Sequence, residues 1–209
     1  MDAPKTLATE SERAARASLL KQPHIKDLTH FVETMRTVKG PGYEIPDFDP
    51  LDGGIDAEVL FLLEAPGPRA ISSGFISRNN PDETAKNFFL LNASAGIDRR
   101  RTVIWNAVPW YIGSGKKIRP ARQDDVREAD NWLVELLRLL RKLRVVMFVG
   151  QKALHAQGVV HATRPEVEIR KMPHPSPMFI NRAPGNRERV LTELQKLSAC
   201  AAKSGRIQD

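Results

Sequence analysis

The sequence has a single cysteine and no long apolar run, and both absences narrow what the protein can be. Cys200 alone cannot form a disulfide within the chain, a thiolate zinc site or an iron–sulfur cluster. The longest apolar runs, residues 59–63 and 145–149, fall far short of the roughly 18 residues that a membrane span requires. The first twelve residues carry acidic side chains and no apolar stretch typical of a secretory signal. We therefore expect a cytoplasmic protein without metal or cofactor and without a membrane partner.

Basic side chains exceed acidic ones. Lys and Arg total 32 against 25 Asp and Glu, which gives a formal net charge of +7. Clustered Lys and Arg favour a polyanionic partner, because their binding releases counterions from a phosphate backbone. A mildly basic composition is also common in proteins that never touch nucleic acid, so charge alone leaves both possibilities open. With 209 residues, 41% of them apolar, the chain suits one folded domain.

Strand and helix patterns alternate through most of the chain. Four segments are expected to form strands, at 57–63, 102–105, 145–149 and 167–172, and the first of them is a near-continuous apolar run typical of a strand buried on both faces. Helical patterns lie between and after them, at 82–95, 124–143, 151–157 and 187–200, with Asn80 as the expected N-cap of the first. This order predicts an α/β protein with three α/β/α layers and a central, mainly parallel sheet of about four strands.

The first 56 residues differ from the rest. Residues 11–38 have a helical pattern that Pro23 breaks, and residues 40–54 are rich in turn formers. We expect one domain over 1–209, in which 1–56 form a helical extension with a lead-in loop and 57–200 form the α/β core.

Candidate functional residues follow the predicted strands. Parallel α/β sheets bind ligands beyond the carboxyl ends of their strands, where loops converge. Glu64 follows the first strand in a Pro and Gly turn, Asn106 ends the second, and His174 begins a proline-punctuated loop after the fourth. Separately, each has an ordinary structural explanation as a cap, a turn residue or a buried imidazole. Their joint placement on one rim favours an active site.

These residues carry a family resemblance. Glu64-Ala65-Pro66-Gly67, Asn106 after an apolar strand, and His174-Pro175-Ser176-Pro177 resemble the motifs of the uracil-DNA glycosylase superfamily. The resemblance covers residues 57–200, and the first turn is closest to the branch that carries GEAPG. It implies a monofunctional hydrolase that releases uracil from DNA, leaves an abasic site and so initiates base-excision repair.

The resemblance also implies roles for single residues. Phe75 matches the aromatic that stacks on the flipped uracil, and Asn106 matches the amide that reads its N3 and O4 edge. His174 matches the histidine at O2. Glu64 is our candidate for positioning the water or stabilising the sugar cation, although Asp82 or Glu83 could reach the site instead of stabilising a helix N-terminus. Ala65, Pro66 and Gly67 would line the base pocket.

DNA contacts are expected on the same rim. Met178 matches the apolar wedge that enters the duplex, and Pro175, Ser176 and Pro177 share its loop. Basic groups near the motifs are Lys116, Lys117, Arg119, Arg122, Arg182, Arg187 and Arg189, of which Lys116 and Arg182 are the main candidates. We interpret 99–101, three consecutive arginines before a strand, as a solvated turn at the opposite edge.

The sequence departs from the family in several places. Leu63 replaces the usual leading glycine, and Ala65 stands where other branches have an Asp or Asn that orients water. The single cysteine excludes an iron–sulfur member. Gly67 replaces the bulky Tyr that rejects thymine, so either another residue such as Phe75 or Ile76 rejects thymine or the rejection is incomplete.

These departures leave alternatives open. One is a glycosylase for another damaged base, such as hypoxanthine or mispaired thymine. Others are a non-catalytic member that binds abasic or uracil-containing DNA, and an α/β domain that acts on a nucleotide-like ligand. We expect a monomer on single- or double-stranded DNA, in a cytoplasm of the bacterial type and associated with the nucleoid through its function.

Overall fold

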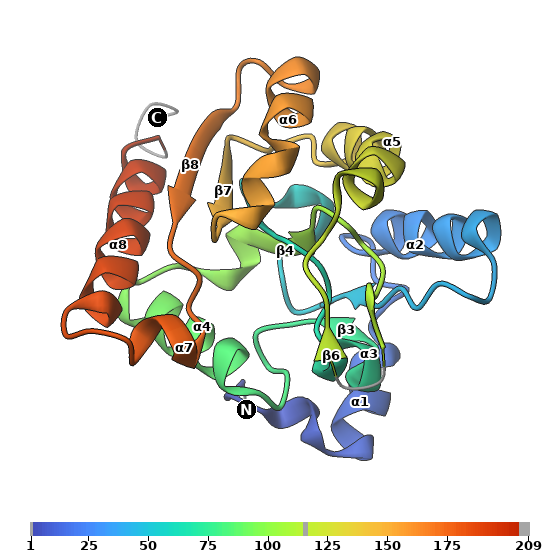
Figure 1. Ribbon diagram of the computed structural model, residues 1–209, viewed down its shortest axis with the longest axis horizontal. Coiled ribbons are helices and arrows are strands. Elements are labelled where there is room, and N and C mark those ends of the chain that lie inside the picture. Colours follow the sequence, from blue (N-terminus) through green and yellow to red (C-terminus); the bar gives the residue numbers. More distant parts are fainter. Residues whose placement is uncertain (1, 115–116, 205–209) are drawn as a thin grey trace.

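Four parallel strands form the central sheet (Figure 1). The computed structural model describes residues 2–114 and 117–204, with the backbone alone at 117, 118 and 200–204. The strands lie in the order β4-β2-β7-β8, and their bounds are β2 Val59–Leu63, β4 Thr102–Asn106, β7 Val145–Val149 and β8 Glu168–Met172. The predicted parallel sheet of about four strands is confirmed.

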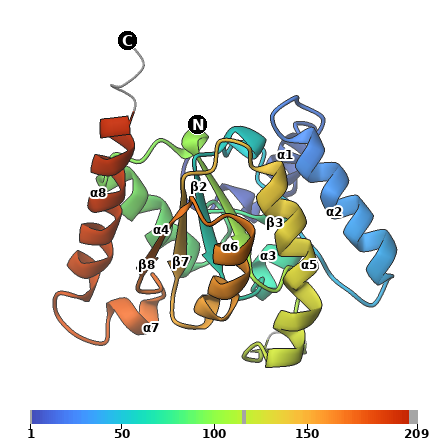
Figure 2. The same ribbon diagram turned by 90° about the horizontal axis from the view of Figure 1, so that it is seen from above.

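Helices cover both faces of this sheet, which confirms the three layers. Figure 2 shows α4 and α8 on one face, with α2, α5 and α6 on the other. The bounds are α2 Lys26–Lys39, α4 Glu83–Ser94, α5 Gln123–Leu139, α6 Gln157–Thr163 and α8 Asn186–Ser204. β2, β4 and β7 are almost entirely buried, as expected for strands covered on both faces, whereas β8 is an edge strand with exposed positions.

Shorter elements connect these layers. The helices are α1 Glu10–Ala17, α3 Pro68–Ser73 and α7 Pro177–Ile180, and the short strands are β1 Asp47–Phe48, β3 Phe75–Ile76, β5 Gly113–Ser114 and β6 Lys117–Ile118. Single 3₁₀ turns are η1 Thr6–Ala8, η2 Gly54–Asp56, η3 Arg99–Arg101 and η4 Lys152–Ala156. The predicted break of the N-terminal helical pattern around Pro23 is confirmed, because it lies between α1 and α2.

The N-terminal third packs into the same core as the sheet. Leu28, Val32 and Met35 of α2 are fully buried in that core. Phe48 of β1 stacks on Trp105 of β4, with ring centroids 3.7 Å apart. The segment from α2 to β1 therefore contributes to the hydrophobic interior and is more than a surface extension.

The N-cap of α4 differs from our prediction of Asn80. Asp82 is the N-cap, and its Oδ1 accepts a hydrogen bond from the backbone N–H of Ala85 at 2.9 Å. Asn80 is instead buried two residues earlier, where its amide donates to the carbonyl of Phe75 and accepts from Ser73. Both residue types are good caps, so the sequence pattern could not separate them.

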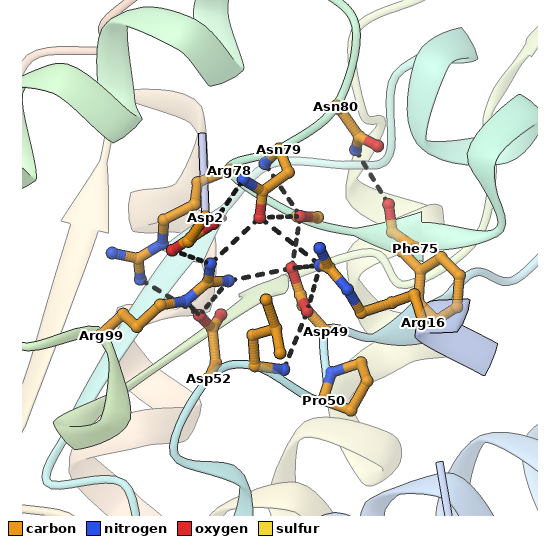
Figure 3. A network of polar contacts seen from close by, with 12 residues as sticks. Asp2, Arg16, Asp49, Pro50, Asp52, Phe75, Arg78, Asn79, Asn80 and Arg99 are labelled. Carbon is orange, nitrogen blue, oxygen red and sulfur yellow. Dashed lines mark hydrogen bonds and ion pairs between the residues drawn. The ribbon is translucent and has the colours of Figure 1, made fainter. Parts of the chain in front are cut away.

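A buried charge network joins the N-terminus to the loop after β3 (Figure 3). Asp49 lies at its centre, and its carboxylate accepts hydrogen bonds from Arg16 at 2.6 Å and from Arg99 at 3.0 Å. Arg99 also donates to Asp52 at 3.0 Å, and Asp52 lies 3.5 Å from the guanidinium of Arg78. Burial alone would raise the pKa of Asp49, but the charges of Arg99 and Arg16 outweigh it and hold that pKa below its ordinary value.

The network corrects our interpretation of residues 99–101 as a solvated turn. Their position before β4 at the opposite edge from the predicted site is as expected. Arg100 is exposed, but Arg99 is largely buried among three aspartates and Arg101 pairs with Glu58 at 2.6 Å. The buried carboxylates require cationic partners. The sequence does not reveal that Arg99 is one of them, because the aspartates lie far from it along the chain.

The same network fixes the segment that follows β3. Ser77 donates to Asp49, and the amide of Asn79 donates to Asp2 at 2.8 Å and to the carbonyl of Ala3 at 2.7 Å. Residues of the N-terminal third thus fix residues 77–79 through hydrogen bonds and ion pairs.

We predict that Arg16→Leu lowers the free energy of unfolding by about 3 kcal/mol, because it removes one partner from a buried ion pair. Urea denaturation measures this loss. Arg127→Ala is the matched control: it removes an ion pair with Asp124 whose side chains are both exposed, so it should cost less than about 0.5 kcal/mol. Equal losses in the two variants would contradict a stabilising role for the network.

Candidate functional site

A cavity of about 430 Å³ opens at the carboxyl ends of β2 and β4. The turn after β2 forms one wall, the segment after β3 and the start of α4 form a second, and the loop after β8 closes it. Seven of the predicted site residues line this cavity together: Glu64, Ala65, Pro66, Gly67, Asn106, His174 and Pro175.

Strand register brings the first two motifs together. Leu63 of β2 is the register partner of Asn106 of β4, so the two strands end at the same level. Beyond the strands, the N–H of Val108 donates to the carbonyl of Glu64 at 2.9 Å. The exits of both strands are therefore tied to each other at the cavity.

Asn106 and Arg78 are buried residues of the cavity wall that each have a polar atom without a hydrogen-bond partner in the described part of the chain, Nδ2 of Asn106 and Nε of Arg78. Asn106 is only 3% exposed. A buried amide left without a partner costs about 1–3 kcal/mol. A site that binds a complementary acceptor would recover this cost, which favours a recognition role for Asn106.

His174 lines the same cavity as the ends of β2 and β4. It begins the loop after β8 and packs over Gly150, where an added Cβ would come within 3.2 Å of the Cβ of His174. Burial lowers the pKa of His174 from its ordinary value, against the carboxylates of Glu64 and Asp82, which raise it. The imidazole is therefore neutral at pH 7 and can donate one hydrogen bond without carrying a charge.

The carboxylate of Glu64 already has partners. Its Oε1 accepts a hydrogen bond from the backbone N–H of Ala121 at 2.7 Å and lies 3.6 Å from Nζ of Lys152. Glu64 thus connects the end of β2 to the segment that precedes α5.

Asp82 and Glu83 are the predicted alternatives to Glu64, and only the first of them lines the cavity. Asp82 lines it while capping α4. Glu83 is exposed, pairs with Lys5 and is not among the cavity residues.

Phe75 is not brought into the cavity. It lies in β3 opposite Asp47 of β1 and is 4% exposed, whereas its neighbour Ile76 lines the cavity. Adjacent strand residues point to opposite sides, so both cannot face the same space. The aromatic ring in the wall is instead Phe88 of α4. The helical spacing of Asp82, Ala85 and Phe88 is the signal that could have identified it.

The loop after His174 projects an apolar tip. Ser176 caps α7 by accepting from the N–H of Phe179, and Pro177 opens the helix. Met178 follows and is 85% exposed, although it is a large apolar side chain. Arg182 is exposed beyond the same short helix, while Lys116 lies outside the described residues.

Neither a metal site nor a membrane span is found in the described part of the chain. Over residues 2–114 and 117–204, three or more His, Cys, Asp or Glu side chains do not gather in a way that could hold a metal ion. None of the described helices is long and apolar enough to cross a membrane. The side chain of Cys200 lies outside the described residues.

The chain was compared with known families and structures. The family model described as "Uracil DNA glycosylase superfamily" matches residues 50–197. A search of curated protein sequences gives no match. The solution NMR structure of a "putative Uracil DNA glycosylase" from Methanosarcina acetivorans is 18% identical, with a TM-score of 0.49, and the alignment covers 71% of this chain and 94% of that one. The crystal structure of mimivirus uracil-DNA glycosylase is 15% identical, with a TM-score of 0.42, 86% of this chain covered and 78% of that one.

We predict that His174 titrates at a pH below the ordinary value of 6.5 in the folded protein, because burial disfavours the imidazolium. NMR titration of the ring protons measures this, with a short unstructured histidine peptide as the reference. A His174 midpoint at or above that of the peptide would contradict the burial argument.

Proposed function

The chain belongs to the uracil DNA glycosylase superfamily, and from this premise we propose that it hydrolyses the N-glycosidic bond of uracil flipped out of DNA. The products would be free uracil and an abasic site, the first intermediate of base-excision repair. The observation that carries the proposal is the buried, unpartnered amide of Asn106 in a cavity shared with a neutral His174.

Asn106 suits the recognition of uracil. Its Nδ2 would donate to O4 of the base, and its Oδ1 would accept from N3–H. Cytosine presents a donor and an acceptor in the reverse arrangement, so it would leave both amide atoms unsatisfied. Leaving buried polar groups unpaired is the strongest discrimination available to a small pocket.

His174 suits stabilisation of the departing base. Bond cleavage leaves negative charge on uracil, and a fixed N–H donor near O2 stabilises that charge in a site from which water is excluded. A neutral imidazole can supply this donor. Ile76 and Phe88 would contact the faces of the ring, with Phe88 as the aromatic group. Phe75 has no such role in this arrangement, because it lies outside the cavity.

The exposed loop after His174 is suited to insert an apolar side chain into duplex DNA. Extruding a base from the stack costs a few kcal/mol, and an apolar side chain that fills the gap offsets part of that cost. Met178 would be this wedge, while Pro175, Ser176 and Pro177 would hold its backbone against the strand. Arg182 beside it would contact a phosphate, which positions the protein without reading sequence. We propose that the protein acts as a cytoplasmic monomer on DNA, with a water molecule as the nucleophile.

We predict that the purified protein releases uracil from a uracil-containing oligonucleotide without added metal, and that Asn106→Ala slows single-turnover release by at least about 100-fold. The measurement is strand cleavage at the abasic product after alkaline treatment. Asn131→Ala is the control, because it removes an amide of the same type from an exposed position on α5.

An intact oligonucleotide after incubation with wild-type protein would contradict the proposed activity. Tight binding to abasic DNA in that case would favour a non-catalytic member, and release of hypoxanthine or mispaired thymine would favour a glycosylase for another base. Wild-type rates in Asn106→Ala would refute the recognition role alone.

We predict that Met178→Ala slows uracil release from duplex DNA about 10-fold and changes release from single-stranded DNA little, because only the duplex leaves a gap in a base stack. Val38→Ala is the matched control, since Val38 is the other large apolar side chain found exposed in the described residues, at 68%, and it lies on α2. Equal slowing on both substrates would contradict a wedge role.

A further inference from the structure

Two carboxylates, those of Glu64 and Asp82, line the same cavity as His174, and hydrolysis needs one of them on the sugar side. A carboxylate there would hold the attacking water and stabilise the positive charge that develops on the sugar. Glu64 follows β2, whereas Asp82 begins α4. Their hydrogen bonds and ion pairs differ, and the difference distinguishes their tasks.

The carboxylate of Glu64 already interacts with other groups of the protein. Its Oε1 is held by the N–H of Ala121 and lies near the ammonium group of Lys152. A carboxylate with these partners has part of its negative charge compensated and its orientation fixed toward a neighbouring segment. This arrangement suits a group that positions the residues before α5.

The carboxylate of Asp82 is less fully engaged by protein groups than that of Glu64. One oxygen, Oδ1, caps α4 through Ala85, and Asp82 has no ion-pair partner among the residues that the structure describes. Its negative charge raises the pKa of His174, as the charge of Glu64 does to a larger extent, so both carboxylates lie within electrostatic reach of the ring. The N-terminus of α4 stabilises a negative charge at this position.

The geometry of Asp82 relative to His174 is also fixed. Asn87, one turn further along α4, donates its amide N–H to the carbonyl of Pro175 at 3.1 Å. This bond joins α4 directly to the loop that carries His174. Asp82 and His174 therefore belong to one connected wall and can act on the same bound nucleotide.

We propose that Asp82 is the catalytic carboxylate that holds the attacking water, and that Glu64 is a positioning residue; this rests on the function proposed above. In the step itself, the C1′–N1 bond breaks and its electron pair leaves with the uracil. The water oxygen forms a bond to C1′, and the water gives one proton to Asp82. Asp82 passes that proton to the departing base, which leaves free uracil, a C1′ hydroxyl on the sugar and the carboxylate restored.

The test compares Asp82→Asn with Glu64→Gln in single-turnover release of uracil. Asn is as good an N-cap as Asp, so Asp82→Asn keeps the bond to Ala85 and removes only the charge and the proton acceptor. Glu64→Gln likewise keeps an acceptor for the N–H of Ala121. We expect Asp82→Asn to lose at least about 100-fold in rate and Glu64→Gln less than about 10-fold.

Two further readouts separate catalysis from structure. The thermal midpoint and the affinity for abasic DNA should stay close to wild type in Asp82→Asn. The pKa of His174, followed by NMR, should fall in Asp82→Asn, because a charge that raises it has been removed.

The inference is overturned if Asp82→Asn keeps a rate within about fivefold of wild type, or if Glu64→Gln loses more than Asp82→Asn does. It is also overturned if the pKa of His174 is unchanged in Asp82→Asn. Failure of the proposed function looks different, since then the wild-type protein itself releases no uracil.

Discussion

The in-register pairing of the parallel strands is the constraint on which the rest of the structure depends. β2 pairs with β4 from Val59 and Thr102 to Leu63 and Asn106, so both strands end at one level. β2 is entirely apolar and β4 is buried at every position, and the core fixes both strands between helices on the two faces. A shift by one residue would turn Asn106 away from the cavity, because successive side chains point to opposite sides. Hydrophobic burial thus sets the geometry of a polar site.

The carboxylate of Asp49 and the amide of Asn106 are both buried, but they differ in whether the protein supplies hydrogen-bond partners. The carboxylate of Asp49 is matched by arginines and the hydroxyl of Ser77, and these bonds hold the segment that follows β3. In the same network, Oδ2 of Asp52 and Nε of Arg78 have no hydrogen-bond partner among the described residues. At Asn106 an amide N–H is left unmatched. Matched burial gives a rigid support, whereas unmatched burial costs free energy that a ligand can recover. A ligand that offers an acceptor to Nδ2 of Asn106 would recover that cost in the cavity.

Much of this could be predicted from the sequence, and the remainder has physical reasons. Apolar runs of strand length predicted the sheet, and their ends predicted where Glu64, Asn106 and His174 would meet. The choice between Phe75 and its neighbour required the strand orientation, which a two-residue strand does not reveal. The partners of Arg99 lie about 50 residues or more away along the chain, so no local pattern indicates that it is buried. The same holds for Glu64, whose bond to Ala121 depends on a distant segment. Local patterns thus predict which residues reach the rim, and long-range pairing decides what each can do there.

The central claim is that the cavity binds uracil through Asn106 beside His174. The most direct measurement is a crystal structure with duplex DNA that contains 2′-fluoro-2′-deoxyuridine, whose glycosidic bond resists cleavage. The account predicts the extruded base in this cavity, with Nδ2 of Asn106 within about 3.2 Å of O4 and the ring of His174 near O2. A base that stays stacked in the duplex, or that binds elsewhere with Nδ2 of Asn106 still unpartnered, would contradict it.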